Sequence, residues 1–340
     1  MTITPPDHGG RLRAAAEHWE IPVAQWLDLS TGINPDSWPV PPIPEAVWRR
    51  LPEDEDGLED AIREWSGVGC RTSCVPVAGS QAAIQALPFL RRPCRVGIPD
   101  PGYTEHGHWW ARAGHRVFRL PLEEAQDDPD WADEMNVIVW IHPNNPTGLA
   151  LSPKRLLDWQ QRLARHRGWL VVDEAFADAR PELSLMSHAG PANRGLIVLR
   201  SLGKFFGLAG VRAGAVLTEP RIADRLRLAL GPWALSGPAR FIMTQALRDT
   251  QWQTDTTRQL DRSRDRLDDL LIEYGLTPTG GTPLFRYILH ADAAAISQAL
   301  AREGVLVRYF EEPSALRIGL PGEESQWLRL RQALAKIESD

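Results

Sequence analysis

The chain has 340 residues and a formal net charge of −6, with 43% hydrophobic and 24% charged residues, which is ordinary for a globular protein of two domains. The negative charge is spread without a basic patch, which argues against a nucleic-acid partner, and no apolar run is long enough to cross a bilayer. The N-terminus lacks the apolar core of a secretory signal, so we expect a cytoplasmic protein without a membrane partner.

The predicted elements begin with an N-terminal arm and connector over residues 1–45. Residues 36–44, DSWPVPPIP, are rich in proline and predict an extended connector rather than a core element. From about residue 75, short apolar runs alternate with longer amphipathic runs. They predict buried strands at 94–98, 137–141, 169–173, 196–199 and 214–217, and helices at 80–90, 104–114 and 154–167. This α/β pattern predicts a large domain over 46–232, with a mostly parallel sheet and helices on both faces.

The pattern changes after Pro232. A long charged helix is predicted at about 254–274, followed by a strand at 284–289 and a helix at 292–303. Two short strands and a terminal helix at 324–338 complete the chain. This order predicts a smaller α+β C-terminal domain over 233–340.

The three cysteines are expected to be reduced thiols, since an odd number in a chain of this length does not suit a disulfide framework. Cys70 and Cys74 lack a second Cys or His pair at ligand spacing. We therefore expect no metal site.

The segment RSLGKFFGLAGVRAG, residues 200–214, follows a predicted strand and places Lys204 among apolar and small residues. Partial burial favours a neutral lysine amine, which can form a Schiff base with a carbonyl group. Ser201 and Arg212 are suited to holding a phosphate. Taken alone, the segment also suits a surface lysine on a loop.

Polar residues also follow two other predicted strands. Asp173 ends the strand in WLVVDEAFAD, where open α/β sheets bind ligands, and could pair with a protonated pyridine nitrogen. A helix-capping or metal-binding acid would fit the same place. In IHPNNPTG, residues 141–148, the turn would present the amide of Asn145.

A third pair of segments suits a phosphate and a planar ring. Gly79, Ser80 and Gln81 open a predicted helix, whose backbone N–H groups and positive end favour an anion. Tyr103, in PDPGY, could lay its ring on a planar heterocycle.

In this order, these segments resemble the fold-type I pyridoxal phosphate enzymes of the class I and II aminotransferase family, over nearly the whole chain. The resemblance implies a pyridoxal 5′-phosphate cofactor and a homodimer. It implies that Lys204 binds the cofactor covalently, Asp173 pairs with the pyridine nitrogen and Tyr103 stacks on the ring. Asn145 would contact the ring's 3′-oxygen. The other implied cofactor-binding residues are Gly79, Ser80, Gln81, Phe176, Ser201 and Arg212. Relatives commonly have tyrosine in place of Phe176, so one phenolic contact is expected to be missing.

The N-terminal sequence HGGRLRAAAEHW, followed by WLDLSTGINP, resembles the subgroup of this family that decarboxylates threonine phosphate for cobalamin biosynthesis. The resemblance implies a small phosphorylated amino acid as substrate. Arg317, in SALRIGLP, matches the arginine that usually binds the substrate carboxylate. We hypothesise that here it binds phosphate, with Arg308 and His8, and leaves the carboxylate in a less polar place that favours loss of carbon dioxide. The substrate-binding set is His8, Gly9, Asn34, Asn145, Arg308 and Arg317.

Two other functions fit parts of the pattern. A histidinol-phosphate-type aminotransferase would use the same cofactor residues, and a requirement for 2-oxoglutarate would distinguish it. A regulatory module with this fold would not need catalysis. The presence of Lys204, Asp173 and Arg212 argues against it.

Overall fold

The computed structural model describes residues 8–127 and 130–337, so the first seven residues of the predicted arm and residue 338 of the predicted last helix lie outside it. The described chain packs into two compact units. The first contains residues 38–145 and 149–253 apart from the two undescribed positions, and the second contains 8–37, 146–148 and 254–337. These units describe packing. The predicted domains, 1–45, 46–232 and 233–340, stay a prediction.

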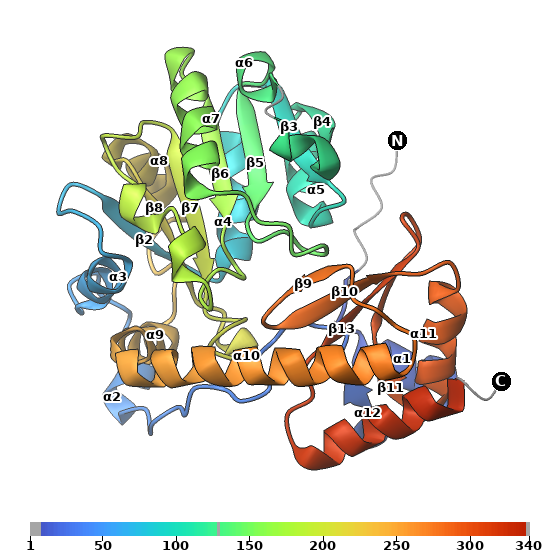
Figure 1. The fold of residues 1–340 in the computed structure, drawn as a ribbon. Helices are drawn as coiled ribbons and strands as arrows, with labels where there is room; N and C mark the ends of the chain where they lie inside the picture. The colour runs from blue at the N-terminus through green and yellow to red at the C-terminus, as the bar shows by residue number, and fades with distance from the viewer. Residues whose placement is uncertain (1–7, 128–129, 338–340) are drawn as a thin grey trace. The chain divides into compact units, whose positions relative to one another are not determined.

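The first unit is built on a seven-stranded sheet in the order β2-β8-β7-β6-β5-β3-β4 (Figure 1). The strands from β7 to β4 in this order are parallel, and β8 is antiparallel to β2 and β7. The predicted fold class, a mostly parallel sheet covered by helices, is therefore confirmed. The strands are β2 (Ser73–Val77), β3 (Arg95–Asp100), β4 (Arg116–Pro121), β5 (Val137–Ile141), β6 (Trp169–Asp173), β7 (Leu196–Ser201) and β8 (Gly214–Thr218).

Helices cover both faces of this sheet (Figure 1). On one face, residues of α4 and α8 belong to the same buried apolar cluster as alternate strand residues such as Val139 and Val171. On the other, Trp159 of α7 packs edge-on against Trp140 of β5, with ring centroids 5.1 Å apart. Central strands buried on both faces are continuously apolar. The helices are α2 (Glu45–Arg49), α3 (Leu58–Ser66), α4 (Ser80–Ala86), α5 (Thr104–Arg112), α6 (Trp131–Glu134), α7 (Pro153–Arg165), α8 (Pro220–Leu230) and α9 (Gly237–Arg248).

The second unit holds a four-stranded antiparallel sheet in the order β12-β13-β10-β9, and a short parallel pair of β1 with β11. Three short strands precede the last helix, so the prediction of two was wrong: β11 and β12 are separated by Val307 alone, which hides their boundary in the sequence. The elements are α1 (Leu12–Trp19), β1 (Leu27–Asp28), α10 (Thr250–Glu273, whose first turn lies in the first unit), β9 (Gly280–Thr282), β10 (Phe285–Leu289), α11 (Ala293–Arg302), β11 (Val305–Leu306), β12 (Arg308–Phe310), β13 (Ala315–Gly319) and α12 (Glu324–Ile337).

The proline-rich connector forms no helix or strand, as predicted, but it is anchored at one residue. Trp38 is buried, donates its indole N–H to Asp249 Oδ2 at 3.1 Å and donates its backbone N–H to the carbonyl of Phe206 at 2.9 Å. The segment is thereby fixed beside the loop that carries Lys204.

The thiols of Cys70, Cys74 and Cys94 are all free. Across residues 8–127 and 130–337, no group of three His, Cys, Asp or Glu side chains is arranged to hold a metal ion. Over the same ranges, no helix is both long enough and apolar enough to span a bilayer.

Candidate active site

Asp173 lies at the carboxyl end of β6, almost completely buried, and its carboxylate is oriented by two neighbours. His106 Nε2, on α5, lies 2.8 Å from Asp173 Oδ2, and the backbone N–H of Ala175 donates to Oδ1 at 3.2 Å. His106 is itself 1% exposed. Because both groups are shielded from water, the imidazole fixes the direction in which the carboxylate can face a ligand.

Tyr103 directly precedes α5 and is held by a chain of polar contacts. Its hydroxyl donates to Gln81 Oε1 at 3.3 Å, and Gln81 donates to Glu105 Oε2 at 2.5 Å. Trp109 also donates to Glu105 Oε2, at 2.8 Å. Burial, and then the charges of Glu105 and Asp173, raise the pKa of the Tyr103 hydroxyl, which therefore stays protonated. Tyr103 and Gln81, which were both predicted to bind the cofactor, are thus joined by a hydrogen bond between their side chains.

The residues predicted to hold a phosphate meet where β2, β7 and β8 adjoin. Gly79 has a positive φ of 72°, and a Cβ on it would lie 2.8 Å from Arg212 Nη2. A Cβ on Gly214 would lie 3.0 Å from the backbone nitrogen of Ser80, and Gly214 pairs with Ser201 in the sheet. The structure therefore brings four predicted residues to one corner, and the absence of side chains on two glycines makes the close approach possible.

Lys204 lies in the turn that follows β7. Its Nζ is 5.3 Å from the ring centroid of buried Phe176. The next two residues, Phe205 and Phe206, are buried and pack against Trp252, so the turn is anchored by its aromatic side chains. Asn145 is half-buried in the turn after β5. An amine beside an apolar ring, on a rigid turn, suits covalent chemistry.

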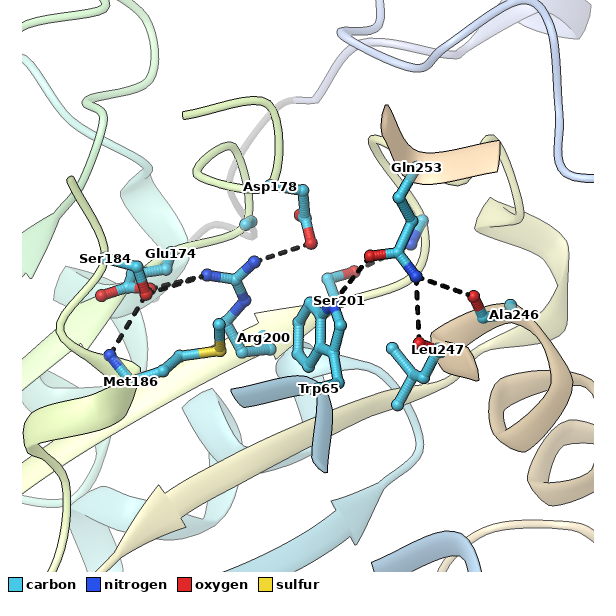
Figure 2. A network of polar contacts seen from close by, with 12 residues as sticks. Trp65, Glu174, Asp178, Ser184, Met186, Arg200, Ser201, Ala246, Leu247 and Gln253 are labelled. Carbon is cyan, nitrogen blue, oxygen red and sulfur yellow. Dashed lines mark hydrogen bonds and ion pairs between the residues drawn. The ribbon is translucent and has the colours of Figure 1, made fainter. Parts of the chain in front are cut away.

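Beneath this turn, Arg200 forms a buried network that the sequence analysis missed (Figure 2). Its guanidinium contacts Glu174 Oε2 at 2.7 Å and Asp178 Oδ1 at 2.6 Å, and lies over the ring of Trp65 at 4.7 Å. Glu174 also accepts from the hydroxyl of Ser184. Burial raises the pKa of both carboxyl groups, against the opposing charge of Arg200. The network joins the segment after Asp173 to the strand that leads to Lys204.

Replacing Arg200 with methionine is expected to lower the free energy of unfolding by about 3–5 kcal/mol, because two buried carboxylates lose their counter-ion. Groups whose pKa is raised in the folded state lose stabilisation as the pH rises, so the deficit should be larger at pH 8 than at pH 5. Urea unfolding at both pH values measures it. Arg266→Met, which breaks an exposed 2.6 Å pair with Glu324, should cost less than about 1 kcal/mol. Equal losses in the two variants would contradict a special role for the buried network.

In the second unit, Arg308 and Arg317 are directly opposite each other on β12 and β13. Arg317 is buried, donates from Nη2 to the carbonyl of Ser30 at 2.7 Å, and lies over the ring of Phe285. Burial, and then the charge of Arg308, lower the pKa of Arg317 to about 10. Two guanidinium groups so placed repel each other, and an anion bound between them would relieve that repulsion.

The N-terminal glycines lie against the same Ser30. A Cβ on Gly9 would be 2.5 Å from the Ser30 carbonyl oxygen, and the backbone N–H of Gly10 donates to Ser30 Oγ at 2.7 Å. His8, next to them, is half-buried. Asn34 is buried, and its Oδ1 accepts from the backbone N–H of Asp36 at 3.0 Å, so its side chain shapes the turn. Gly9 and Arg317 thus both lie against Ser30, although they are far apart in the sequence.

Known proteins resemble this chain over most of its length. Residues 51–334 match the model of the family described as aminotransferase class I and II. Threonine-phosphate decarboxylase of Pseudomonas aeruginosa is 49% identical to this chain, over 96% of the chain and 97% of the relative. The enzyme of the same name from Sinorhizobium sp. is 41% identical, over 97% and 98%.

The fold also matches solved structures. The crystal structure of histidinol-phosphate aminotransferase from Sinorhizobium meliloti in complex with pyridoxal-5′-phosphate has a TM-score of 0.75 to this chain. The match covers 83% of this chain and 81% of that one, with 21% sequence identity. At this identity, the likeness concerns the fold.

Proposed function

Because the chain belongs to the class I and II aminotransferase family, we propose that it is a pyridoxal phosphate enzyme that decarboxylates L-threonine O-3-phosphate to (R)-1-aminopropan-2-yl phosphate, as a step in cobalamin biosynthesis. The names of the two relatives at 49% and 41% identity support this reaction. The observation that carries it is the opposed pair Arg308 and Arg317, which suits a dianionic phosphate better than a carboxylate.

The residues of the first unit fit pyridoxal phosphate. Gly79 lies close to the guanidinium of Arg212, and a side chain on Gly79 would fill the space where an anion could bind. The carboxylate of Asp173 is buried and oriented by His106, as a partner for a pyridinium nitrogen requires. When bound, the cofactor withdraws electrons from the substrate's α-carbon. We propose that Lys204 holds it covalently, with the remaining contacts from Gly79, Ser80, Gln81, Tyr103, Asn145, Asp173, Phe176, Ser201 and Arg212.

Phe176 contributes an apolar surface and no hydroxyl to this site. Without a phenol there, Asn145 would be the chief contact to the cofactor's 3′-oxygen. Ser201 Oγ accepts from the backbone N–H of Gly203 at 3.1 Å, which leaves its own proton for a phosphate oxygen.

The substrate-binding residues would determine, by how they orient the substrate, which bond at its α-carbon breaks. Arg308 and Arg317, with His8, Gly9, Asn34 and Asn145, would hold the substrate and its phosphate. The carboxylate would then be turned away from a strong cation, where loss of its charge as carbon dioxide is favoured. Lys204 would return a proton to the α-carbon, since its amine must be near that carbon to exchange with the substrate amine.

The test is carbon dioxide release from L-threonine O-3-phosphate by the purified holoenzyme, without any keto acid. We expect sustained release. An enzyme that instead turned over histidinol phosphate, and only when 2-oxoglutarate was added, would be an aminotransferase and would refute the proposal.

A homodimer and a cytoplasmic location are further parts of the proposal, which rest on the resemblance to the family. The choice of threonine phosphate over serine phosphate rests on the names of the relatives. The two substrates differ by one methyl group, which is worth about 1–3 kcal/mol in a pocket.

A further inference from the structure

Three polar residues form a row across the four-stranded sheet of the second unit. Arg308 of β12 is opposite Arg317 of β13, and Arg317 is opposite Tyr287 of β10. In antiparallel strands, directly opposite side chains project from the same face of the sheet, with Cβ atoms about 4.5–5.5 Å apart. One face of the sheet therefore presents two guanidinium groups and a phenol side by side.

The hydroxyl of Tyr287 is buried without a partner. Tyr287 is 3% exposed, and within residues 8–127 and 130–337 no hydrogen-bond partner lies near its oxygen. Burial also raises the pKa of this hydroxyl to about 12, so it keeps its proton and remains a donor. A buried hydroxyl without a partner lowers stability, and its presence therefore needs an explanation.

Aromatic rings fix the three polar groups in place. Arg317 lies over Phe285 at 5.2 Å and Arg308 over Phe310 at 5.5 Å, both measured to the ring centroid. Phe310 also meets Tyr287 edge-on, at 6.1 Å between centroids. These rings limit the movement of the side chains, so the phenol has little freedom to find another partner.

We propose that Tyr287 is a specificity-determining residue, whose hydroxyl donates a hydrogen bond to the phosphate group bound by Arg308 and Arg317. The inference rests on the proposed function for the identity of that anion. A phosphate monoester has three terminal acceptor oxygens, whereas a carboxylate has two, which the two arginines can already satisfy. A third donor in the row thus favours phosphorylated substrates over dicarboxylates.

The experiment compares the holoenzyme with its Tyr287→Phe variant, so that the cofactor occupies its own phosphate site. The probes are 1-aminopropan-2-yl phosphate and 1-aminopropan-2-ol, which differ by the phosphate and have no carboxylate to lose. Binding is followed by the visible absorbance of the cofactor. We expect the variant to bind the phosphorylated amine roughly 10- to 100-fold more weakly, the effect of one hydrogen bond to a charged group, and the alcohol unchanged.

Tyr309→Phe is the matched control. Tyr309 is the next residue after Arg308 on β12, is opposite Leu316, and therefore projects from the other face of the sheet. It should bind both amines as the unchanged protein does. Thermal unfolding without a phosphorylated ligand gives a second readout: Tyr287→Phe should unfold at the same or a higher temperature, because it loses a hydroxyl that has no partner in this state.

Equal weakening of both amines, or no weakening of the phosphorylated one, would overturn the inference. A lower unfolding temperature with unchanged binding would assign the hydroxyl a structural role and also overturn it. The proposed function fails separately, since a protein that binds the phosphorylated amine through Tyr287 but releases no carbon dioxide would refute the decarboxylase alone.

Discussion

Lys204→Ala is expected to lower the rate of carbon dioxide release from threonine phosphate by at least about 10⁴-fold, because it removes both the covalent attachment of the cofactor and the proposed proton donor. The direct readout is the position of the cofactor. Borohydride reduction of the unchanged holoenzyme should fix pyridoxal phosphate on the peptide that contains Lys204, and mass spectrometry would identify it.

The chain has three lysines, which makes the control simple. Lys154, near the start of α7, is exposed. Lys336, near the end of α12, pairs with Glu303 at 2.5 Å. Lys154→Ala should keep full activity and the same labelled peptide. Reduction that fixed the cofactor on Lys154 or Lys336 would show that the site has been assigned to the wrong lysine.

Arg317→Met should lower kcat/KM for threonine phosphate by about 30- to 5,000-fold, the range found when one partner of a buried charge pair is truncated. The side-chain volume is nearly kept, so the phosphate loses its buried cation without a large cavity. Binding of plain threonine, measured by the cofactor's absorbance, should change little. The contrast between the two ligands tests which group Arg317 holds.

Arg302→Met provides a charge-matched control in the same unit, because Arg302 is exposed at the end of α11. It should leave both ligands unaffected. If Arg317→Met weakened threonine and threonine phosphate equally, then Arg317 would hold the carboxylate that the two ligands share. That is the arrangement of a transaminase, and the explanation offered for decarboxylation would be wrong.

Much of the fold was predictable because burial leaves a direct pattern in the sequence. β5, β6 and β7 are buried along their length, so each is a continuous apolar run. β4 was missed because it lies at an edge of the sheet, where exposed Arg116 and Arg119 interrupt the apolar pattern. β2 was missed because it contains Pro76, which is unusual in a strand that pairs along its length.

Some residues of the candidate site were likewise predictable from the sequence, and others were not. Lys204 and Asp173 could be proposed from the sequence, since Lys204 follows an apolar strand, Asp173 ends one, and the carboxyl ends of parallel strands lie at one edge of the sheet. His106 gave no such signal: it is 67 residues from Asp173, within an ordinary amphipathic helix. Arg200 resembled any polar residue near a strand end, yet it binds two buried acids from a neighbouring segment.

The sequence by itself determined the α/β class, most of the central strands and helices, and the family, because those depend on local apolar periodicity and on short segments with fixed spacing. From the same segments it yields a proposal for the residues that contact the cofactor. Only the tertiary structure decided which side chains orient them. Arg308 and Arg317 became an opposed pair, and Tyr287 joined them, through the register of three antiparallel strands. Register depends on hydrogen bonds between strands and on packing against the rest of the unit, so no single segment of sequence encodes these contacts.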